Sequence, residues 1–494
     1  MLRSSVRDVL VRTARVLPVA VLGLCVACDA EPAPVEPAAG RPAPVTAAAV
    51  EPAPVAAPAP EACPSWARLD LKSLPPLPAS AYTSTFEQVW RIVQEKHFDP
   101  TLGCQDWPAL RLEYGQRLAA AKDPAEAYAT MNALLRTLKQ SHFKVVPPGG
   151  AVETEASGPA RTPVHVRMID GQVIVVDPAV GGVDSGLPRG AVILAVDGRP
   201  IADIVGKVKS AALRADEVAF QTMWAVEAAM HGAAGAKRSV TFLDPTHADA
   251  ETTREVACVM PAGELVSLGN LRDIPTTVAH RMLPGTKVGH LAFNYWMLPM
   301  VQRVGAALTE MRAQGMTALV LDLRGNPGGV GAMSIPVARM LLTEAGSLGK
   351  LQFREFAQEF NVAANPDAFT GPVIVLVDEG TASTSEIFAA GLRDLGRVKI
   401  YGARPSAGAA LPSMIEQLEG GAMLQYVVGD YHSSRGAVAE GEGVRPDVVV
   451  PETRADFIAG RDPVLEAAVA ALSGASADAK APAGKARKPK VKPP

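Results

Sequence analysis

The sequence predicts an α/β fold (α+β overall), in which a core of buried, largely parallel strands follows a β-rich unit and a helical unit. Three patterns support this prediction. From Lys287 onward, short apolar runs alternate with amphipathic stretches, as in a parallel sheet covered by helices. Residues 163–200 carry closely spaced strands and turns. Residues 82–140 have the periodicity of amphipathic helices.

The chain is long enough for several domains, and its charge is nearly balanced. It has 494 residues, of which 48% are hydrophobic, and a formal net charge of -3. This length predicts two to four domains with ample core. The balanced charge argues against nucleic acid as the main partner. The cysteines and histidines do not have the spacing of a metal site, and the sequence indicates no cofactor.

The N-terminus is typical of a bacterial export signal. An apolar stretch, residues 16–27, is too short to span a bilayer comfortably and fits the hydrophobic region of a signal peptide. Arginines precede it at Arg3, Arg7, Arg12 and Arg15. The segment Leu24–Cys28 resembles a lipoprotein box with Cys28 as the lipidated residue. We therefore expect residues 1–28 to be a signal peptide and the protein to be a periplasmic or cell-envelope lipoprotein. The alternative is ordinary cleavage nearby, with Cys28 removed or left free.

Low-complexity segments flank the part of the chain that is expected to fold. Residues 29–64 are rich in alanine and proline, cannot bury a core, and are typical of an extended tether. Such a tether after Cys28 would hold the folded part away from a membrane surface. Residues 474–494 are expected to form a disordered basic tail.

Three further cysteines lie in the part that is expected to fold. Cys63 and Cys104 have similar neighbours near its start, and a disulfide between them is possible in an exported protein. Cys258 lies in an apolar, strand-like run and is expected to be a small buried hydrophobic residue.

The first folded unit, expected over residues 65–148, is helical. Apolar residues follow the spacing of one helix face in two stretches, which are Phe86, Val89, Trp90, Ile92 and Val93, and Tyr128, Met131, Leu134, Leu135 and Leu138. This pattern predicts a small helical module that ends near Ser141 and His142.

The second unit, expected over residues 149–262, is rich in hairpins. Strand patterns at 164–168 and 172–176 precede a turn, a further strand and a helix from Ile201. The stretch Gly186–Gly198 resembles part of a PDZ-like domain. Capture of a peptide by strand addition is therefore a hypothesis for this unit.

The third unit, expected over residues 263–473, alternates strands and helices. The expected strands cover residues 288–293, 317–323, 372–377 and 398–401. The expected helices cover residues 301–314, 332–342 and 385–395. Two turns that join a strand to a helix in this unit have residues suited to catalysis.

The first turn, Gly380–Glu386, follows an apolar strand and precedes a helix. Small residues at such a turn expose a hydroxyl at the end of a buried strand, and the helix N-terminus behind it favours developing negative charge. A serine nucleophile is presented in this way. Ser385, directly before Glu386, is the candidate helix cap.

The second turn, Arg324–Gly329, is rich in glycine. Glycines allow backbone N–H groups to converge on a small anion, such as a tetrahedral oxyanion or a phosphate. The turn lacks the lysine of a phosphate loop and the spacing of a dinucleotide fingerprint. Considered alone, it is also consistent with a simple tight turn.

Together the two turns resemble those of the C-terminal processing (tail-specific) serine peptidases. The resemblance covers about residues 80–473, and the matching segments are 322–329, 377–386, 441–447 and 460–466. It implies a ClpP/crotonase-like α/β core with an inserted PDZ-like domain and an N-terminal helical module. It also implies a serine-type peptidase, a hydrolase, that acts on protein or peptide substrates.

The resemblance assigns roles to residues of both turns. Ser383 corresponds to the nucleophile of the family. Thr384, and either Gly328 or Gly329, would donate backbone N–H groups to the oxyanion.

One departure from the family changes the expected base. The best-known members activate the serine with a lysine, and Gly408 occupies that position here. Arg404 stays protonated and cannot replace it, and Lys399 lies within the preceding strand. A second branch of the family, similar to the tricorn protease core, uses a histidine that follows a serine before the PDZ-like domain. His142, after Ser141, matches that pattern.

Imidazole can accept the serine proton near neutral pH and return it to the leaving amine. The tricorn-like branch implies a carboxylate that orients the histidine, for which Glu440 fits best and Glu442 is the alternative. Ser141 would complete a tetrad by hydrogen bonding. Considered alone, His142 would be explained better as a helix cap or a buried, hydrogen-bonded histidine.

The sequence therefore predicts an exported serine endopeptidase that acts through an acyl-enzyme. The alternative is a non-catalytic ligand- or peptide-binding protein on the same fold, similar to the interphotoreceptor retinoid-binding protein. The missing lysine favours this alternative, and the retained Ser383 and His142 oppose it. A lipid anchor would make the membrane a partner, whereas nucleic acid is not expected.

Overall fold

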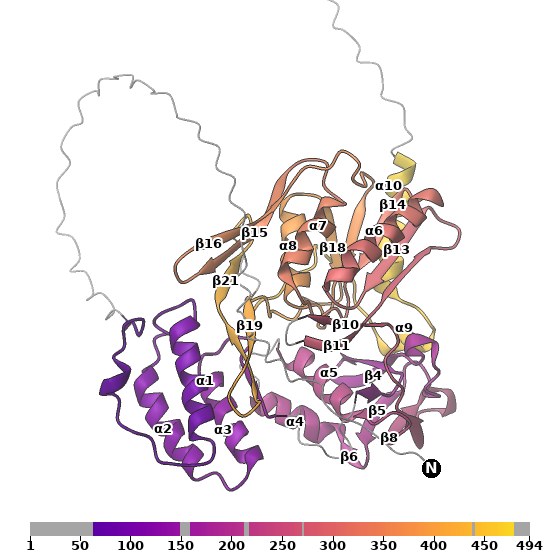
Figure 1. The fold of residues 1–494 in the computed structure, drawn as a ribbon. Helices are drawn as coiled ribbons and strands as arrows, with labels where there is room; N and C mark the ends of the chain where they lie inside the picture. Colours follow the sequence, from indigo (N-terminus) through magenta and orange to yellow (C-terminus); the bar gives the residue numbers. More distant parts are fainter. Residues whose placement is uncertain (1–62, 149–158, 212–216, 269–270, 437–439, 479–494) are drawn as a thin grey trace, which may run out of the picture. The chain divides into compact units, whose positions relative to one another are not determined.

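The computed structural model describes residues 63–148, 159–211, 217–268, 271–436 and 440–478 (Figure 1). The predicted signal peptide, nearly all of the predicted tether and most of the predicted tail lie outside these residues. Within the described residues, no helix combines the length and apolar character needed to cross a membrane.

The N-terminal unit packs helices around a small core (Figure 1). Its elements are η1 (Leu71–Ser73), α1 (Thr83–Lys96), α2 (Trp107–Ala119) and α3 (Pro124–Arg136). Asp106 and Asp123 cap α2 and α3, because each side chain accepts a hydrogen bond from a backbone N–H in the first turn. Trp90 and Trp107 stack with their ring centroids 6.0 Å apart. The disulfide considered from the sequence is present and joins Cys63 to Cys104, with the Cα atoms 5.1 Å apart.

A hairpin from far along the chain completes this helical core. It consists of β19 (Ser413–Gln417) and β20 (Met423–Val427), and β1 (Lys144–Val146) pairs with β20. Leu424 of β20 is fully buried among the helical side chains. By packing, the hairpin therefore belongs with the helical unit, although it lies within the residues expected to form the α/β core.

The second unit is built on an antiparallel sheet with the strand order β3-β4-β5-β8-β9, and β6 pairs with β5. Its strands are β2 (Ala160–Arg161), β3 (His165–Ile169), β4 (Gln172–Asp177), β5 (Val192–Val196), β6 (Arg199–Pro200), β7 (His231–Gly232), β8 (Lys237–Asp244) and β9 (Ala250–Ala257). Side chains of α4 (Ile201–Ala211) and α5 (Glu217–Ala229) share its core. Cys258 is buried, as expected. The PDZ-like role of this unit stays a prediction.

Six strands of the third unit form one sheet in the order β12-β13-β14-β17-β18-β22. They are β12 (Val278–Met282), β13 (Val288–Phe293), β14 (Ala318–Asp322), β17 (Val373–Leu376), β18 (Val398–Gly402) and β22 (Val448–Val449). Only the β12–β13 pair is antiparallel in this sheet, so the predicted α/β fold with a largely parallel sheet is confirmed.

Alternate residues of the central strands face two different apolar clusters. On one side, Leu319 and Val375 pack with α6 (Leu298–Ala313), α7 (Ser334–Arg339) and α8 (Thr384–Asp394). On the other side, Val320 and Ile374 pack with α10 (Pro463–Asp478). Burial on both faces explains why β14 and β17 are continuous apolar runs rather than alternating ones.

The helix expected over residues 332–342 is shorter than predicted. A 3-10 turn, η4 (Gly331–Met333), precedes α7, which begins at Ser334. Pro336 has no backbone N–H and tolerates only the first turn of a helix, so α7 cannot extend back to Ala332. The remaining described elements are β10 (Glu264–Leu268), β11 (Leu271–Thr276), β15 (Gly346–Phe353), β16 (Ala357–Val362), β21 (Gly429–His432), α9 (Arg454–Ile458), η2 (Val180–Gly182) and η3 (Pro245–His247).

Candidate active site

Ser383 lies at the carboxyl end of the sheet, immediately before α8. Its backbone has φ 55° and ψ -119°, a conformation that side-chain-bearing residues rarely adopt. Such a sharp turn presents a side chain at the end of a strand, with the N-terminus of a helix behind it. Ser383 is partly exposed, whereas its neighbours Ala382 and Thr384 are buried.

The helix-cap role predicted for Ser385 is wrong. The cap position belongs to Ser383, because Glu386 in the first turn of α8 accepts a hydrogen bond from the Ser383 N–H at 3.0 Å. The Ser385 hydroxyl is instead buried. It accepts from the indole N–H of Trp296 at 2.8 Å and donates to the carbonyl of Asn326 at 3.1 Å.

Hydrogen bonds join the two predicted turns to each other. The Asp378 carboxylate accepts from the N–H groups of Gly325 and Gly380, at 2.8 and 2.9 Å. The Thr381 hydroxyl donates to the carbonyl of Leu323 at 2.8 Å. The turn Gly380–Glu386 (the nucleophile turn) and the turn Arg324–Gly329 (the glycine turn) therefore form one rigid structure.

The glycine turn approaches Ser383 too closely for a side chain. A Cβ atom at Gly328 would lie 2.7 Å from the Cβ of Ser383, and Gly328 has φ 100°. The Gly328 N–H donates to the side chain of Asn326 at 3.0 Å. Within the described structure, the N–H groups of Gly329 and Thr384 have no acceptor. Of the two glycines left open by the sequence, Gly329 therefore has the available donor.

Ser141, His142 and Glu440 lie together although they are far apart in the sequence. The Ser141 hydroxyl donates to Glu440 Oε2 at 2.9 Å and lies 2.7 Å from His142 Nδ1. The Ser141 N–H donates to Glu440 Oε1 at 2.8 Å. The carboxylate thus reaches the imidazole through the serine hydroxyl rather than directly.

This pattern assigns the tautomer of His142. The single hydroxyl proton of Ser141 is donated to Glu440, so the Ser141 oxygen accepts from Nδ1–H of the ring. The lone pair of a neutral His142 is then on Nε2. Burial lowers the pKa of His142 to about 4, so the ring is neutral around pH 7.

Glu442, the alternative orienting acid, lies apart from this group. Its side chain is 70% exposed and pairs with Arg445 at 3.4 Å. In the described structure, no hydrogen bond joins the Ser383 hydroxyl to the His142 ring. Both parts of the site nevertheless line one cavity of about 660 Å³, which Ser141, His142, Pro327, Ala382 and Ala409 help to enclose.

Glu386 connects the nucleophile turn to the neighbouring loop of residues 406–410. Besides the Ser383 N–H, its buried carboxylate accepts from the Ser406 hydroxyl at 2.6 Å and from the N–H groups of Gly408 and Ala409 at 2.9 and 3.0 Å. The next N–H of this loop, that of Ala410, donates to Glu440. Burial raises the pKa of Glu386 to about 7, although these donors favour its ionised form.

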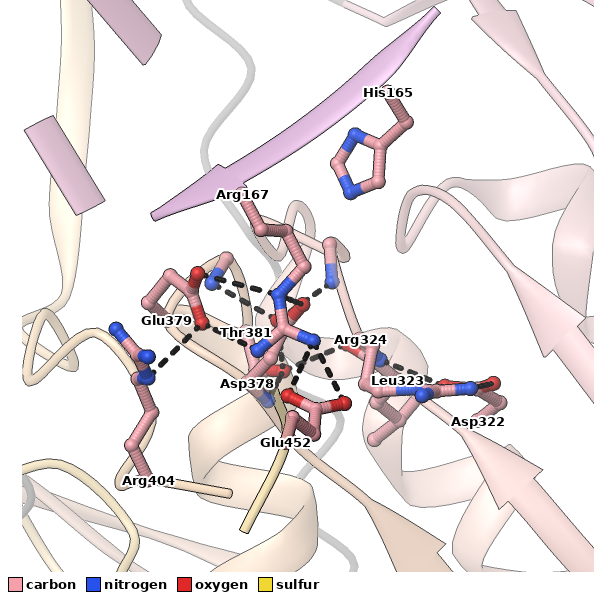
Figure 2. Close-up of polar contacts among 12 residues, drawn as sticks. His165, Arg167, Asp322, Leu323, Arg324, Asp378, Glu379, Thr381, Arg404 and Glu452 are labelled. Carbon is pink, nitrogen blue, oxygen red and sulfur yellow. Dashed lines mark hydrogen bonds and ion pairs between the residues drawn. The ribbon is translucent and has the colours of Figure 1, made fainter. Parts of the chain in front are cut away.

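A buried arginine links the second unit to the nucleophile turn (Figure 2). Arg167 of β3 donates to Glu379 at 2.9 Å and to Glu452 at 2.8 Å. Burial raises the pKa of Glu379, but the charge of Arg167 outweighs this effect and lowers it to about 2. Arg404 adds a longer ion pair to Glu379, at 3.7 Å. Arg167 is absent from the residues that the sequence singles out, and its only signal there is a charge within an apolar strand.

The glycine turn is also tied to the C-terminal helix. Arg324 donates to Asp322 at 2.7 Å and to Asp462, just before α10, at 2.8 Å. Arg324 thereby braces the glycine turn against the segment that begins α10. Within the described residues, no group of histidine, cysteine, aspartate and glutamate is arranged to hold a metal ion.

Comparisons with known proteins identify two domains in this chain. A model of peptidase family S41 matches residues 287–450, and a model of the tricorn protease C1 domain matches residues 78–135. The first covers the parallel sheet and the nucleophile turn, and the second covers the helical unit.

Similar curated proteins are carboxyl-terminal-processing proteases. The one from Synechocystis sp. is 28% identical over 400 residues, which are 78% of this chain and 86% of that protein. The chloroplastic C-terminal processing peptidase of Tetradesmus obliquus is 28% identical over 391 residues, which are 75% of this chain and 78% of that protein.

Solved structures share the fold. The photosystem II D1 C-terminal processing protease has a TM-score of 0.50 at 24% identity, over 75% of this chain and 93% of that one. Mature CPAF complexed with lactacystin has a TM-score of 0.56 at 15% identity, over 80% of this chain and 98% of that one.

We predict that Glu386→Gln changes the pH dependence of stability. The raised pKa of Glu386 means that the folded protein holds a proton which the unfolded chain releases near pH 4.5, so wild-type stability falls as pH rises towards 7. The variant lacks this component. The free energy of unfolding of the wild type minus that of the variant should therefore decrease by roughly 2–3 kcal/mol from pH 5 to pH 8.

Urea unfolding at several pH values measures this difference. The matched control is Glu359→Gln, at an exposed position in β16, which should track the wild type at every pH. A wild-type-minus-variant difference for Glu386→Gln that is constant with pH would show that Glu386 does not titrate in this range.

Proposed function

This chain belongs to the C-terminal processing serine peptidases of family S41, and we propose that it hydrolyses peptide bonds with Ser383 as the nucleophile and His142 as the general base. The observation that carries this proposal is the arrangement of Glu440, Ser141 and His142. It leaves a basic imidazole nitrogen at the cavity that also borders the nucleophile turn. The names of the relatives point to protein substrates that are cut near their C-termini.

The proposed first step is attack of Ser383 Oγ on the substrate carbonyl, with transfer of its proton to His142 Nε2. The N–H groups of Thr384 and Gly329 would stabilise the tetrahedral oxyanion, helped by the N-terminus of α8. His142 then gives the proton to the leaving amine, and an acyl-enzyme forms on Ser383. Water repeats the sequence and releases the acid.

Ser141 and Glu440 would hold His142 in its reactive tautomer. When the ring takes up a proton, the negative charge of Glu440 favours the imidazolium through the Ser141 hydroxyl. The missing hydrogen bond between Ser383 and His142 is compatible with this role, because catalytic hydrogen bonds of free enzymes often tighten only when substrate binds.

The residues near the lysine position of other family members support histidine as the base. Gly408 occupies that position, and its N–H donates to Glu386. Lys399 is exposed on β18, and Arg404 pairs with Glu379. None of these residues offers a neutral amine to Ser383.

The second unit is proposed to hold the substrate chain as a PDZ-like domain does. Its buried Arg167 supports a link to catalysis, because its partner Glu379 lies four residues before Ser383. Export through residues 1–28 and lipidation of Cys28 are proposed from the sequence alone.

We predict that Ser383→Ala abolishes labelling by a fluorophosphonate probe and lowers peptidase activity by a factor of at least about 1,000. The reason is that the variant has no nucleophile. The matched control is Ser385→Ala, which removes the other serine hydroxyl of the turn. That hydroxyl forms hydrogen bonds to Trp296 and Asn326, and the variant should still be labelled. Equal labelling of wild type and Ser383→Ala would contradict the proposal, and co-purified apolar ligand in that case would favour the binding-protein alternative.

We predict an acid limb near pH 4 in the pH profile of kcat/KM. The lowered pKa of His142 keeps the base form down to that pH, so activity should be lost only as His142 becomes protonated below it. Steady-state kinetics between pH 3.5 and 8 would locate the limb. A limb near pH 7 that disappears in Glu386→Gln would belong to Glu386, and one that persists in that variant would show that His142 has an ordinary pKa.

We predict that the full-length protein is recovered with membranes and incorporates radiolabelled palmitate, and that Cys28→Ser loses both properties. The reason is that Cys28 follows the apolar segment of the proposed signal. Cell fractionation and autoradiography measure the two properties. The proposed anchor is wrong if the wild-type protein is soluble and unlabelled.

A further inference from the structure

We propose that the cavity beside the nucleophile turn binds a carboxylate of the peptide substrate through Arg136 and Lys144. This inference rests on the proposed peptidase function and adds a feature of its substrates, an anionic group close to the bond that is cut. The carboxylate has two possible sources, the C-terminus of the peptide or an acidic side chain.

The charge of the cavity wall is the first observation. Arg136 and Lys144 line the cavity, and among the described residues no aspartate or glutamate lines it. Both side chains are exposed, and within the described structure neither has an ion pair or a side-chain hydrogen bond. No described residue of the cavity wall therefore neutralises these two cations, and an anion is the ligand that complements them.

Hydrogen bonds of Asn132 join the two segments that carry these cations, α3 and β1. Its side-chain amide donates to the carbonyl of Val145 at 2.9 Å, and its oxygen accepts from the Val145 N–H at 2.9 Å. These bonds fasten β1, which begins at Lys144, to α3. Arg136 lies four residues after Asn132, so it follows one turn later on the same face of α3.

The same hydrogen bonds determine whether a peptide can bind to β1 by adding a strand. Val145 presents its N–H and carbonyl at the edge of β1 that does not pair with β20, and Asn132 satisfies both groups. A peptide therefore cannot add a strand at Val145. Arg136 and Lys144 would instead bind the peptide through its terminal carboxylate or an acidic side chain.

One part of the cavity wall, which includes Ala382 beside Ser383, is apolar. Ala382, Ala407 and Ala409 cluster together with Phe220 packed against them. A peptide with small side chains against these alanines could direct its anionic group to Arg136 and Lys144, which line the same cavity. A position in the last turn of α3 would also suit Arg136 as a partner of the helix dipole, but that role does not explain Lys144.

Binding to the Ser383→Ala protein tests this inference without requiring catalysis. The probes are acetyl-pentaalanine with a free C-terminal carboxylate, the same peptide as its amide, and the amide with one alanine replaced by glutamate. At least one anionic peptide should bind about 3- to 10-fold more tightly than the neutral amide, a range expected for one or two partly exposed ion pairs. The free acid and the glutamate peptide distinguish the two sources of the carboxylate.

The variant Arg136→Gln/Lys144→Gln, made in the same Ser383→Ala background, should lose this preference while it binds the neutral amide unchanged. Arg68→Gln/Lys122→Gln is the matched control, because it removes the same charge from exposed positions of the helical unit that do not line the cavity. The preference should also weaken as ionic strength rises from about 0.05 to about 0.5 M.

The inference is wrong if neither anionic peptide binds more tightly than the amide, or if the Arg136/Lys144 variant keeps the preference. Failure of the proposed function is recognised separately. In that case the wild-type protein is not labelled at Ser383, whereas the anionic peptides still bind more tightly than the neutral amide.

Discussion

The unusual backbone of Ser383 depends on one buried carboxylate. Glu386 accepts hydrogen bonds from the Ser383 N–H, the Ser406 hydroxyl and two N–H groups of the loop 406–410. A left-handed conformation at a serine costs on the order of 1–3 kcal/mol and persists only where surrounding contacts enforce it. Burying Glu386 is itself unfavourable, as its raised pKa shows. The four donors offset part of that cost, so strain at Ser383 and burial of Glu386 are maintained by the same set of contacts.

The loop that Glu386 holds also connects the two halves of the site. Gly408 and Ala409 donate to Glu386, and Ala410 donates to Glu440, whose carboxylate reaches His142 through Ser141. A glycine at position 408 places no side chain between these two carboxylates. Backbone N–H groups of three consecutive residues, Gly408 to Ala410, therefore link the carboxylate beside Ser383 to the carboxylate beside Ser141 and His142.

Each of the three units contributes to the environment of Ser383. The helical unit provides Ser141 and His142, and its core is closed by the hairpin 413–427 from the third unit. The second unit provides Arg167, which forms buried ion pairs with Glu379 and Glu452. Removing Arg167 would leave buried carboxylates unpaired, at a cost typical of several kcal/mol. The geometry of the nucleophile turn therefore depends on how the second unit packs against the third.

The sequence by itself determined the strands and helices around the parallel sheet, the strand–turn–helix at Ser383 and the glycine turn, because periodicity and small residues act over a few neighbouring positions. It did not reveal that Ser383 rather than Ser385 occupies the cap position, since that depends on the hydrogen bonds of Glu386. Tertiary structure alone decided that the hairpin 413–427 packs with the helices and that Arg167 pairs with Glu379, 212 residues away. It also decided that Glu440 meets Ser141 across 299 residues. Local patterns specify which face of an element is buried. The partner that covers this face depends on how segments distant in the sequence pack together.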